Sequence, residues 1–310
     1  MSESQGSVRG EPRAVVVWWF RSYLPQYESQ IRGLVKALES QCSLQVFAAP
    51  VIGTWKSWQS IFSRHFPATE LPDPDILIGA GSETRWAMIA ARMIRGGRII
   101  TLSKPAWPRW GYDLCIAPAH EGARTSKRMI ATRGMLPAPS VPRPKISGTG
   151  LIVIGGPSLQ YSWSDDRLIN QITEILNQHP DSRWYLTTTL HTPAETEQRL
   201  QELSGHNIFC IPHHDVDPNW MLNRIQDAEQ VWITEDKLSV IYQALTADAA
   251  IGVLDVRRRK VNHEVEALDG LVVFFPDWHA GKALHAPSPP FNESARCATE
   301  IFQRWFSSAA

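Results

Sequence analysis

A glycine-containing loop follows one of the most apolar short runs in the chain. The motif Gly155-Gly156-Pro157-Ser158 comes directly after residues 151–154, which show no polar alternation, and an amphipathic segment at 166–178 begins soon afterwards. Such a run is typical of a strand buried on both faces of a parallel sheet. Ligands bind at the carboxyl ends of parallel strands, where loop amides and a helix N-terminus can hold an anion. The spacing therefore predicts a phosphate-facing loop, and ordinary turn chemistry is the alternative that stays open.

The elements that position this loop are strands alternating with helices. This alternation predicts right-handed crossovers and doubly wound parallel sheets. In the first half we expect strands at 15–20, 44–49, 75–78, 98–102 and 112–117, with helices at 27–39, 84–94 and, with an aromatic face, 55–66. In the second half we expect strands at 151–154, 183–188, 208–211, 230–234, 250–254 and 272–275, with helices at 166–178, 194–203, 219–225, 238–245 and 262–268.

A stretch rich in proline and glycine, 137–150, separates the two halves and is interpreted as an interdomain linker. The prediction is α/β, with two doubly wound Rossmann-like domains facing each other across a cleft. The boundaries are 1–140 for an acceptor domain, 141–150 for the linker and 151–290 for a nucleotide-sugar domain. Residues 291–310 form a closing helix that could pack back on the first domain.

Composition narrows the classes of partner and compartment. The formal net charge is zero, so overall charge gives no argument for a nucleic-acid partner. Between Glu83 and Lys145, however, twelve Lys or Arg face three acids, and the chain holds 13 tryptophans. Basic and tryptophan-rich surface suits an anionic glycolipid or a membrane surface, although most tryptophans pack in cores.

The cysteines and the apolar segments bear on localisation. Four widely spaced cysteines without metal-ligand spacing favour a reducing cytoplasm. No segment is long enough to cross a bilayer, and residues 1–13 lack the apolar centre of a signal peptide. We therefore expect a cytoplasmic protein that could be peripheral on the inner membrane.

Several motifs occur in the order found in one known family. They are Gln30, Gly33 and Leu34 in the first expected helix, Gly79-Ala80-Gly81, Pro118 with His120, Gly155-Gly156-Pro157-Ser158, Thr188 with Thr192 and Pro193, and Thr234 with Asp236 and Ser239. In these motifs the chain resembles a bacterial member of the mitochondrial-fission "elongated mitochondria" family, whose members are similar to glycosyltransferases of the GT-B architecture. The resemblance covers about residues 15–254.

The chain departs from the family pattern at several motif positions. The chain has Gln26-Tyr27 where the family has a Gly-His pair, and Leu190-His191 where the family has an Arg-Arg pair. It has Lys237 in place of a serine and Gln243 in place of a glutamate. His191 and Lys237 could supply the missing positive charge for donor phosphates, or they could be ordinary surface residues.

The resemblance implies that the second domain holds a nucleotide sugar and the first holds the acceptor. A leaving phosphate can be stabilised by N–H groups and cationic side chains, so no metal or other cofactor is required. The loops at 155–158, 187–191 and 235–239 all follow strands of one sheet and should converge. The predicted donor-binding residues are Gly155, Gly156, Pro157, Ser158, Thr188, Thr189, His191, Glu235, Asp236, Lys237 and Ser239. For Thr234 and Asp236, capping of the next helix is an equal alternative.

An inverting transfer needs a base at the acceptor hydroxyl. His120 and Glu121 follow a strand at the correct end and are the best candidates. His213-His214-Asp215 resembles a metal pair, but no third ligand at a suitable spacing is evident, so we expect no metal.

The leading hypothesis is a metal-independent glycosyltransferase that acts on an anionic glycolipid or on a lipopolysaccharide-core acceptor. The alternatives are a non-catalytic scaffold of the same fold and a sugar-nucleotide epimerase. The oligomeric state does not follow from the sequence.

Overall fold

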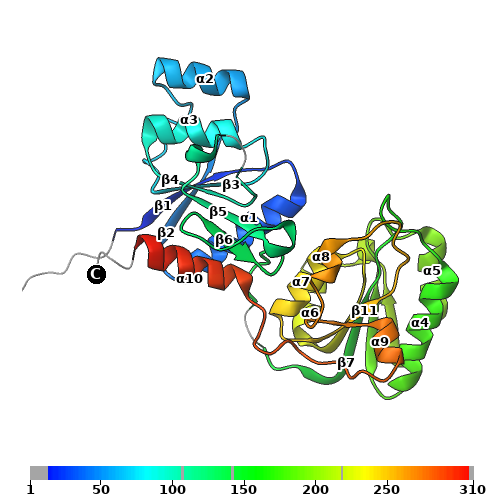
Figure 1. The fold of residues 1–310 in the computed structure, drawn as a ribbon. Coiled ribbons are helices and arrows are strands. Elements are labelled where there is room, and N and C mark those ends of the chain that lie inside the picture. Colours follow the sequence, from blue (N-terminus) through cyan, green and yellow to red (C-terminus); the bar gives the residue numbers. More distant parts are fainter. Residues whose placement is uncertain (1–12, 106–107, 141–142, 218, 307–310) are drawn as a thin grey trace, which may run out of the picture. The chain divides into compact units, whose positions relative to one another are not determined.

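The chain folds into two compact α/β units, each built on its own six-stranded sheet. The computed structural model describes residues 13–105, 108–140, 143–217 and 219–306. Contacts group 1–117, 124–130 and 297–310 into one unit, and 118–123 with 131–296 into the other. The prediction of two separate doubly wound sheets is confirmed (Figure 1). The facing of the domains across a cleft stays a prediction.

The first sheet has the order β2-β1-β3-β4-β5-β6, and the pairs from β2 to β5 are parallel. Its strands are β1 (Val15–Phe20), β2 (Leu44–Ala49), β3 (Ile76–Gly79), β4 (Arg98–Thr101), β5 (Leu114–Pro118) and β6 (Met129–Thr132). Its helices are α1 (Pro25–Glu39), α2 (Thr54–Ser63) and α3 (Arg85–Arg95), with the 3₁₀ turns η1 (Arg109–Gly111) and η2 (Ala119–Glu121). Sequence analysis missed β6, because its four residues, enclosed by Arg128 and Arg133, are too few to show a strand pattern.

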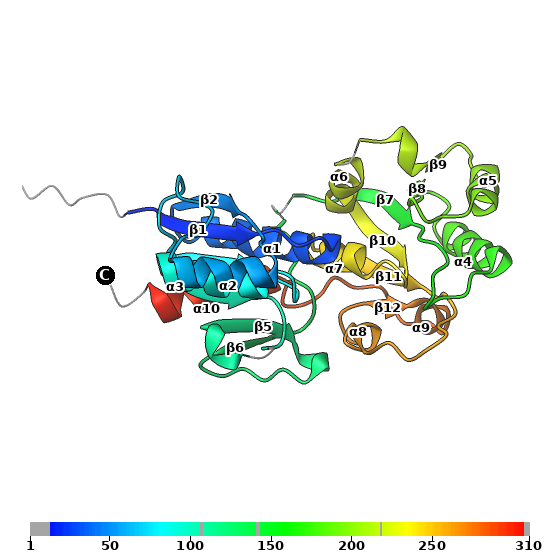
Figure 2. The same cartoon turned by 90° about the horizontal axis from the view of Figure 1, so that it is seen from above.

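The second sheet has the order β12-β11-β10-β7-β8-β9, and every neighbouring pair is parallel. Its strands are β7 (Ile146–Val153), β8 (Arg183–Thr187), β9 (Ile208–Ile211), β10 (Ala228–Thr234), β11 (Ala250–Leu254) and β12 (Val273–Phe274). Its helices are α4 (Asp165–Gln178), α5 (Ala194–Glu202), α6 (Trp220–Asp227), α7 (Leu238–Thr246), α8 (His263–Glu266) and α9 (Phe275–His279), with the 3₁₀ turn η3 (His213–Asp215). Figure 2 shows the sheet edge-on between its helices.

Strand β7 is central and buried, as its apolar run predicts, but it begins at Ile146, inside the expected linker. Its first two residues are exposed, and Gly148, which follows them, adopts a positive φ of 69°. The apolar run that begins at Leu151 marks only the end of the strand, because Ser147, Gly148, Thr149 and Gly150 before it interrupt the apolar pattern.

The last helix, α10 (Glu293–Trp305), joins the first unit from Cys297 onward. Arg304 donates to the carbonyl of Lys127, and the Arg98 guanidinium lies 5.1 Å from the ring centroid of Trp305. All four cysteines are free thiols. Among the described residues, no helix has both the length and the apolar character that a bilayer span requires.

Candidate functional site

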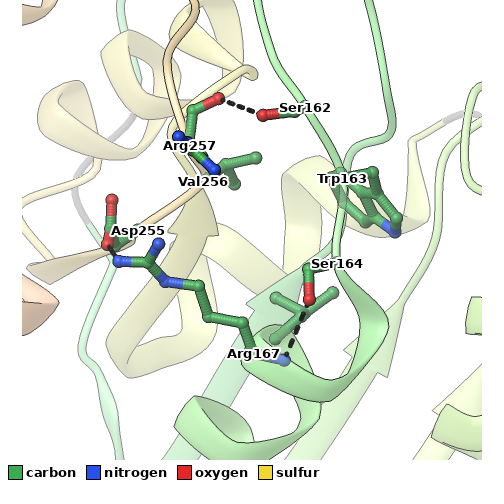
Figure 3. A pocket seen from close by; sticks show the side chains of 8 residues that line it. Ser162, Trp163, Ser164, Arg167, Asp255, Val256 and Arg257 are labelled. Carbon is green, nitrogen blue, oxygen red and sulfur yellow. Dashed lines mark hydrogen bonds and ion pairs between the residues drawn. The ribbon is translucent and has the colours of Figure 1, made fainter.

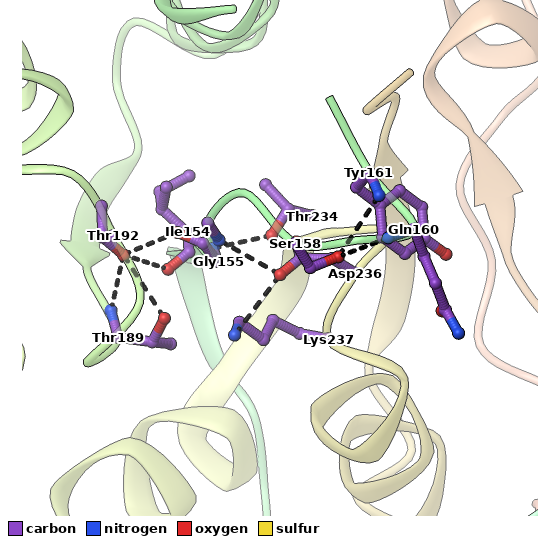
Figure 4. Close-up of polar contacts among 11 residues, drawn as sticks. Ile154, Gly155, Ser158, Gln160, Tyr161, Thr189, Thr192, Thr234, Asp236 and Lys237 are labelled. Carbon is purple, nitrogen blue, oxygen red and sulfur yellow. Dashed lines mark hydrogen bonds and ion pairs between the residues drawn. The ribbon is translucent and has the colours of Figure 1, made fainter. Parts of the chain in front are cut away.

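The candidate site lies where β7 and β10 pair at the centre of the second sheet. The chain leaves β7 toward β8 and β9, and it leaves β10 toward β11 and β12, so strand order reverses between them. In a doubly wound sheet the ligand crevice forms at this switch point, outside the carboxyl ends of the strands. Sequence analysis placed three candidate loops at this edge, and direct hydrogen bonds join them (Figure 4).

The glycine loop is held against the loop after β10. The Gly155 amide donates to Thr234 Oγ1 at 2.7 Å, and the Gly156 amide donates to Asp236 Oδ2 at 3.1 Å. The Ser158 amide donates to the carbonyl of Tyr161. The sequence predicted that these amides face a phosphate. Instead they are satisfied within the domain, because buried N–H groups require partners.

The loop after β8 holds the other side of the glycine loop. Thr192 Oγ1 donates to the carbonyls of Ile154 and Gly155, and it accepts from the Thr189 amide at 2.9 Å. A Cβ on Gly156 would lie 1.8 Å from the carbonyl oxygen of His191. Glycine is therefore required at 156 so that two backbones can approach closely, whether or not a ligand binds.

Asp236 and Lys237 lie together at the start of α7. Lys237 Nζ is 3.3 Å from Asp236 Oδ2, the same oxygen that accepts from Gly156. The N-cap of α7 is Lys237, and no side chain among the described residues caps it. The capping alternative for Thr234 and Asp236 is therefore wrong, since both side chains bind the glycine loop instead.

Ser158, Ser239 and His191 lie at the rim of the site. Ser158 Oγ accepts from the amides of Gln160 and Tyr161 at 3.2 Å, so it shapes its own turn. Ser239 on the first turn of α7, Pro157 and the His191 side chain are exposed to solvent. None of these exposed groups makes a side-chain hydrogen bond within the described ranges.

Glu235 is the buried acid of the site, with 1% of its surface exposed. Arg258 Nε lies 2.9 Å from Glu235 Oε1. Burial raises the pKa of Glu235 to about 7, and the nearby Arg258 charge opposes that rise. Tyr161, which accepts from Asn262 at 3.2 Å, packs against the same carboxyl, and burial raises its pKa to about 12. Glu235 can therefore carry or release a proton near neutral pH.

A run of four basic residues, Arg257-Arg258-Arg259-Lys260, follows β11 at the same edge of the sheet. It pairs with the segment that directly follows the glycine loop. The Arg259 amide donates to the carbonyl of Gln160, the Ser162 amide donates to the carbonyl of Arg257, and Tyr161 and Arg258 form an antiparallel β-bridge. Arg257, Arg259 and Lys260 are exposed and form no ion pair in the part of the chain that is described. Sequence analysis missed this run, although four consecutive cations after a buried strand were the available signal.

A pocket of about 270 Å³ lies between this basic run and the start of α4. Its wall includes Ser162, Ser164, Arg167, Asp255 and Arg257 (Figure 3). Arg167 is paired with Asp255, while Ser162 and Arg257 are tied together through the Arg257 carbonyl. The pocket therefore offers hydroxyls and the Arg257 guanidinium, which has no ion pair with any described residue, and this set suits a polar or anionic ligand.

Thr188 connects the loop after β8 to a histidine pair. Its hydroxyl donates to Glu197 Oε2 at 2.9 Å, and it accepts from the His213 amide at 3.1 Å. Glu197, His213 and His214 bring ligand-type atoms within 4.8 Å of one another. Glu197 is the third group that the sequence did not reveal, and this set could hold a divalent cation such as Zn²⁺.

The predicted base residues lie in the turn η2, within the segment that contacts group with the second unit. His120 and Glu121 line a cavity of about 410 Å³ together with Tyr161, Lys260 and Asn262. Both ring nitrogens of His120 are buried without a hydrogen-bond partner among the described residues. The imidazole therefore has hydrogen-bonding capacity that these residues leave unused, and the base role of His120 stays a prediction.

The two sheets, with the polar loops gathered at the switch point of the second, define a two-domain α/β protein of GT-B-like architecture. The family described as Mitochondrial fission ELM1 matches residues 27–305, and the chain belongs to it. The resemblance drawn from the sequence is thereby confirmed. No curated protein matches the chain in sequence.

Solved structures share the fold at low sequence identity. A putative UDP-N-acetylglucosamine 2-epimerase from Listeria monocytogenes is 14% identical, with 94% of this chain and 95% of that chain covered and a TM-score of 0.60. UDP-GlcNAc 2-epimerase from Neisseria meningitidis, bound to UDP-GlcNAc, is 13% identical, with 94% and 98% covered and a TM-score of 0.56. These likenesses establish the fold.

Proposed function

We propose that the chain is a GT-B-type glycosyltransferase that moves a sugar from a nucleotide-sugar donor to an anionic glycolipid or lipopolysaccharide-core acceptor. The observation that carries the proposal is the junction of four strand-end loops at the switch point, with unpaired cations beside it. The structural neighbour from Neisseria meningitidis, which is bound to UDP-GlcNAc, supports a nucleotide sugar as the ligand class.

In this proposal the donor's diphosphate binds the basic run. Arg257, Arg259 and Lys260 are exposed, whereas the amides of Gly155 and Gly156 are already engaged. Cationic side chains therefore replace bare amides as the groups that stabilise the leaving phosphate. Glu235, buried behind Arg258, positions the run and carries a proton near neutral pH.

The chemical step forms a bond from an acceptor oxygen to the anomeric carbon and breaks the bond from that carbon to the phosphate oxygen. The acceptor proton passes to a base, and His120 is proposed for this role because its ring nitrogens have no internal partner within the described chain. Glu121, its neighbour in η2, is the second candidate.

The test is thermal unfolding with UDP-, GDP-, ADP- and CMP-sugars, since a ligand that binds only the folded state raises the melting temperature. We expect one nucleotide class to stabilise the wild type and the triple variant R257E/R259E/K260E to lose that stabilisation. The triple variant R124E/K127E/R128E reverses the same number of exposed charges in the first unit and should keep donor stabilisation. Absence of stabilisation by every nucleotide sugar would favour the scaffold alternative.

A nucleotide-sugar epimerase is the second candidate, favoured by the two epimerase structures that share the fold. The two activities differ in their need for an acceptor. Incubation with the stabilising nucleotide sugar alone should return an epimerised nucleotide sugar only if the chain is an epimerase. Product that requires a glycolipid acceptor supports the transferase.

A further inference from the structure

Helix α2 carries its aromatic side chains on the outside and its serines on the inside. Ser57 and Ser60 are 0% and 9% exposed, whereas Trp55, Trp58 and Phe62 are 83%, 41% and 82% exposed. At 100° per residue the three aromatic positions lie within about 60° of one another, on the side opposite the serines. An ordinary surface helix buries its apolar side chains and exposes its polar ones, and α2 does the reverse.

Ser57, the fully buried serine of the two, is satisfied where it lies. Ser57 Oγ donates to the carbonyls of Ile52 and Gly53 at 3.3 and 3.1 Å. The helix packs chiefly on α3 rather than on the sheet (Figures 1 and 2). If α2 rotated so that its aromatic side chains pointed inward, large rings would have to fit into the space that two serines now fill. Close packing therefore fixes the aromatic side chains on the outside.

The aromatic face extends beyond α2. Trp58 lies 5.1 Å from Trp86 of α3 and 6.3 Å from Phe62, ring centroid to ring centroid. Trp58, Phe62 and Trp86 therefore form one connected cluster, and Trp55 lies on the same side of α2; these four residues are here called the α2 aromatic face. Connected apolar surface of this kind marks an interaction site rather than chance exposure.

The charges around this face point to the partner. Lys56, Arg64 and His65 are exposed, Lys56 and Arg64 form no ion pair in the described chain, and no acid lies between Glu39 and Glu70. Tryptophan and phenylalanine next to unpaired cations suit the headgroup region of an anionic bilayer, where indole rings bury their apolar body and cations meet lipid phosphates.

We propose that the α2 aromatic face docks the protein on an anionic bilayer, with Trp55 and Phe62 inserted and Lys56 and Arg64 on the lipid phosphates. The inference deepens the proposed function and rests on it only for the idea that the acceptor is lipid-borne. Docking itself requires no nucleotide sugar, so its test can fail while donor binding succeeds, and the reverse.

The experiment is co-sedimentation of the full chain with vesicles of phosphatidylcholine alone or mixed with phosphatidylglycerol, without any nucleotide. We expect binding to the anionic vesicles, and we expect W55S/F62S to weaken it by about tenfold. The charge variant K56E/R64E should weaken binding to anionic vesicles most at low salt, because salt screens the contribution of surface charges.

Matched controls keep the result specific. L222S removes another exposed apolar side chain, on α6, and K36E reverses an exposed charge on α1; both should bind vesicles like the wild type. Unchanged melting temperatures show that the α2 variants still fold. Vesicle binding that W55S/F62S leaves unchanged would overturn the proposal. A dimer that W55S/F62S dissociates, without vesicle binding by the wild type, would overturn it too and make a second copy the occupant.

Discussion

Glu235 shows how burial of one residue couples the candidate site to pH. Its carboxyl is almost fully enclosed, and its pKa is raised from 4.5 to about 7. As pH rises above 4.5, the unfolded chain releases this proton while the folded chain retains it. The folded state therefore loses stability across pH 4.5 to 7, because it must finally ionise a buried acid.

Substitution of Glu235 by glutamine removes that titration. The amide has the shape of the protonated acid and stays neutral. Between pH 5 and pH 8 the free energy of unfolding of the wild type should therefore fall by about 2 kcal/mol more than that of E235Q. Urea unfolding at a series of pH values measures the difference. The exposed Glu202 offers the matched control, and E202Q should follow the wild type. An equal pH slope in wild type and E235Q would contradict the assignment.

Gly156 is the residue at which the site depends most on close backbone approach. A methyl group there would meet the His191 carbonyl, whereas a methyl on Gly205 meets nothing within 4 Å. We therefore predict that G156A lowers the free energy of unfolding by about 1 to 3 kcal/mol and that G205A changes it little. Chemical denaturation of both variants tests this, and equal stability of the two would show that the loops separate without cost.

At the scale of elements, the strand-end loops act as one unit. Thr234 ends β10 and Asp236 follows it, the glycine loop follows β7, and Thr192 lies in the loop after β8, yet hydrogen bonds join all three segments. The basic run after β11 is tied to the same glycine loop through Gln160 and Tyr161. A ligand that contacts one loop should therefore restrain the others.

Hydrogen exchange can detect that restraint. With a stabilising nucleotide sugar present, we expect slower amide exchange in residues 158–162, 187–192, 235–239 and 257–260 together. The strands β1 and β3 of the first sheet serve as the internal reference and should exchange at an unchanged rate. Protection confined to a single loop would argue against the coupled arrangement.

In the whole molecule, the candidate donor site and the candidate docking face lie in different units. The second holds the buried acid, the exposed cations and the switch-point loops, and the first holds the α2 aromatic face. We thus propose donor binding by the second unit and bilayer docking by the first. In a variant that combines R257E/R259E/K260E with W55S/F62S, the loss of donor stabilisation and the loss of vesicle binding should each equal the loss measured for the separate variant. The two sets of residues share no partner, so their effects should be independent.

Local patterns in the sequence were sufficient to predict the two-domain plan and most element positions. Runs such as residues 250–254 are apolar throughout and the helices repeat at 3.6 residues, and both patterns are local, so they can be recognised without any partner. It also located the loops at the correct sheet edge, since the carboxyl ends of parallel strands share one side. The short strand β6 and the polar start of β7 lacked such a pattern and were missed.

The hydrogen-bond partners of the loop groups became visible in the folded structure alone. The amide of Gly155 meets a hydroxyl 79 residues away, and the Gly156 amide meets a carboxylate 80 residues away, so no local pattern could reveal that both are occupied. The same holds for Glu197, which joins His213 and His214 through the fold. On α2 the spacing predicted an aromatic face, but only packing on α3 determined that serines face inward and the aromatic rings face water, because burial depends on the neighbour as well as on the helix.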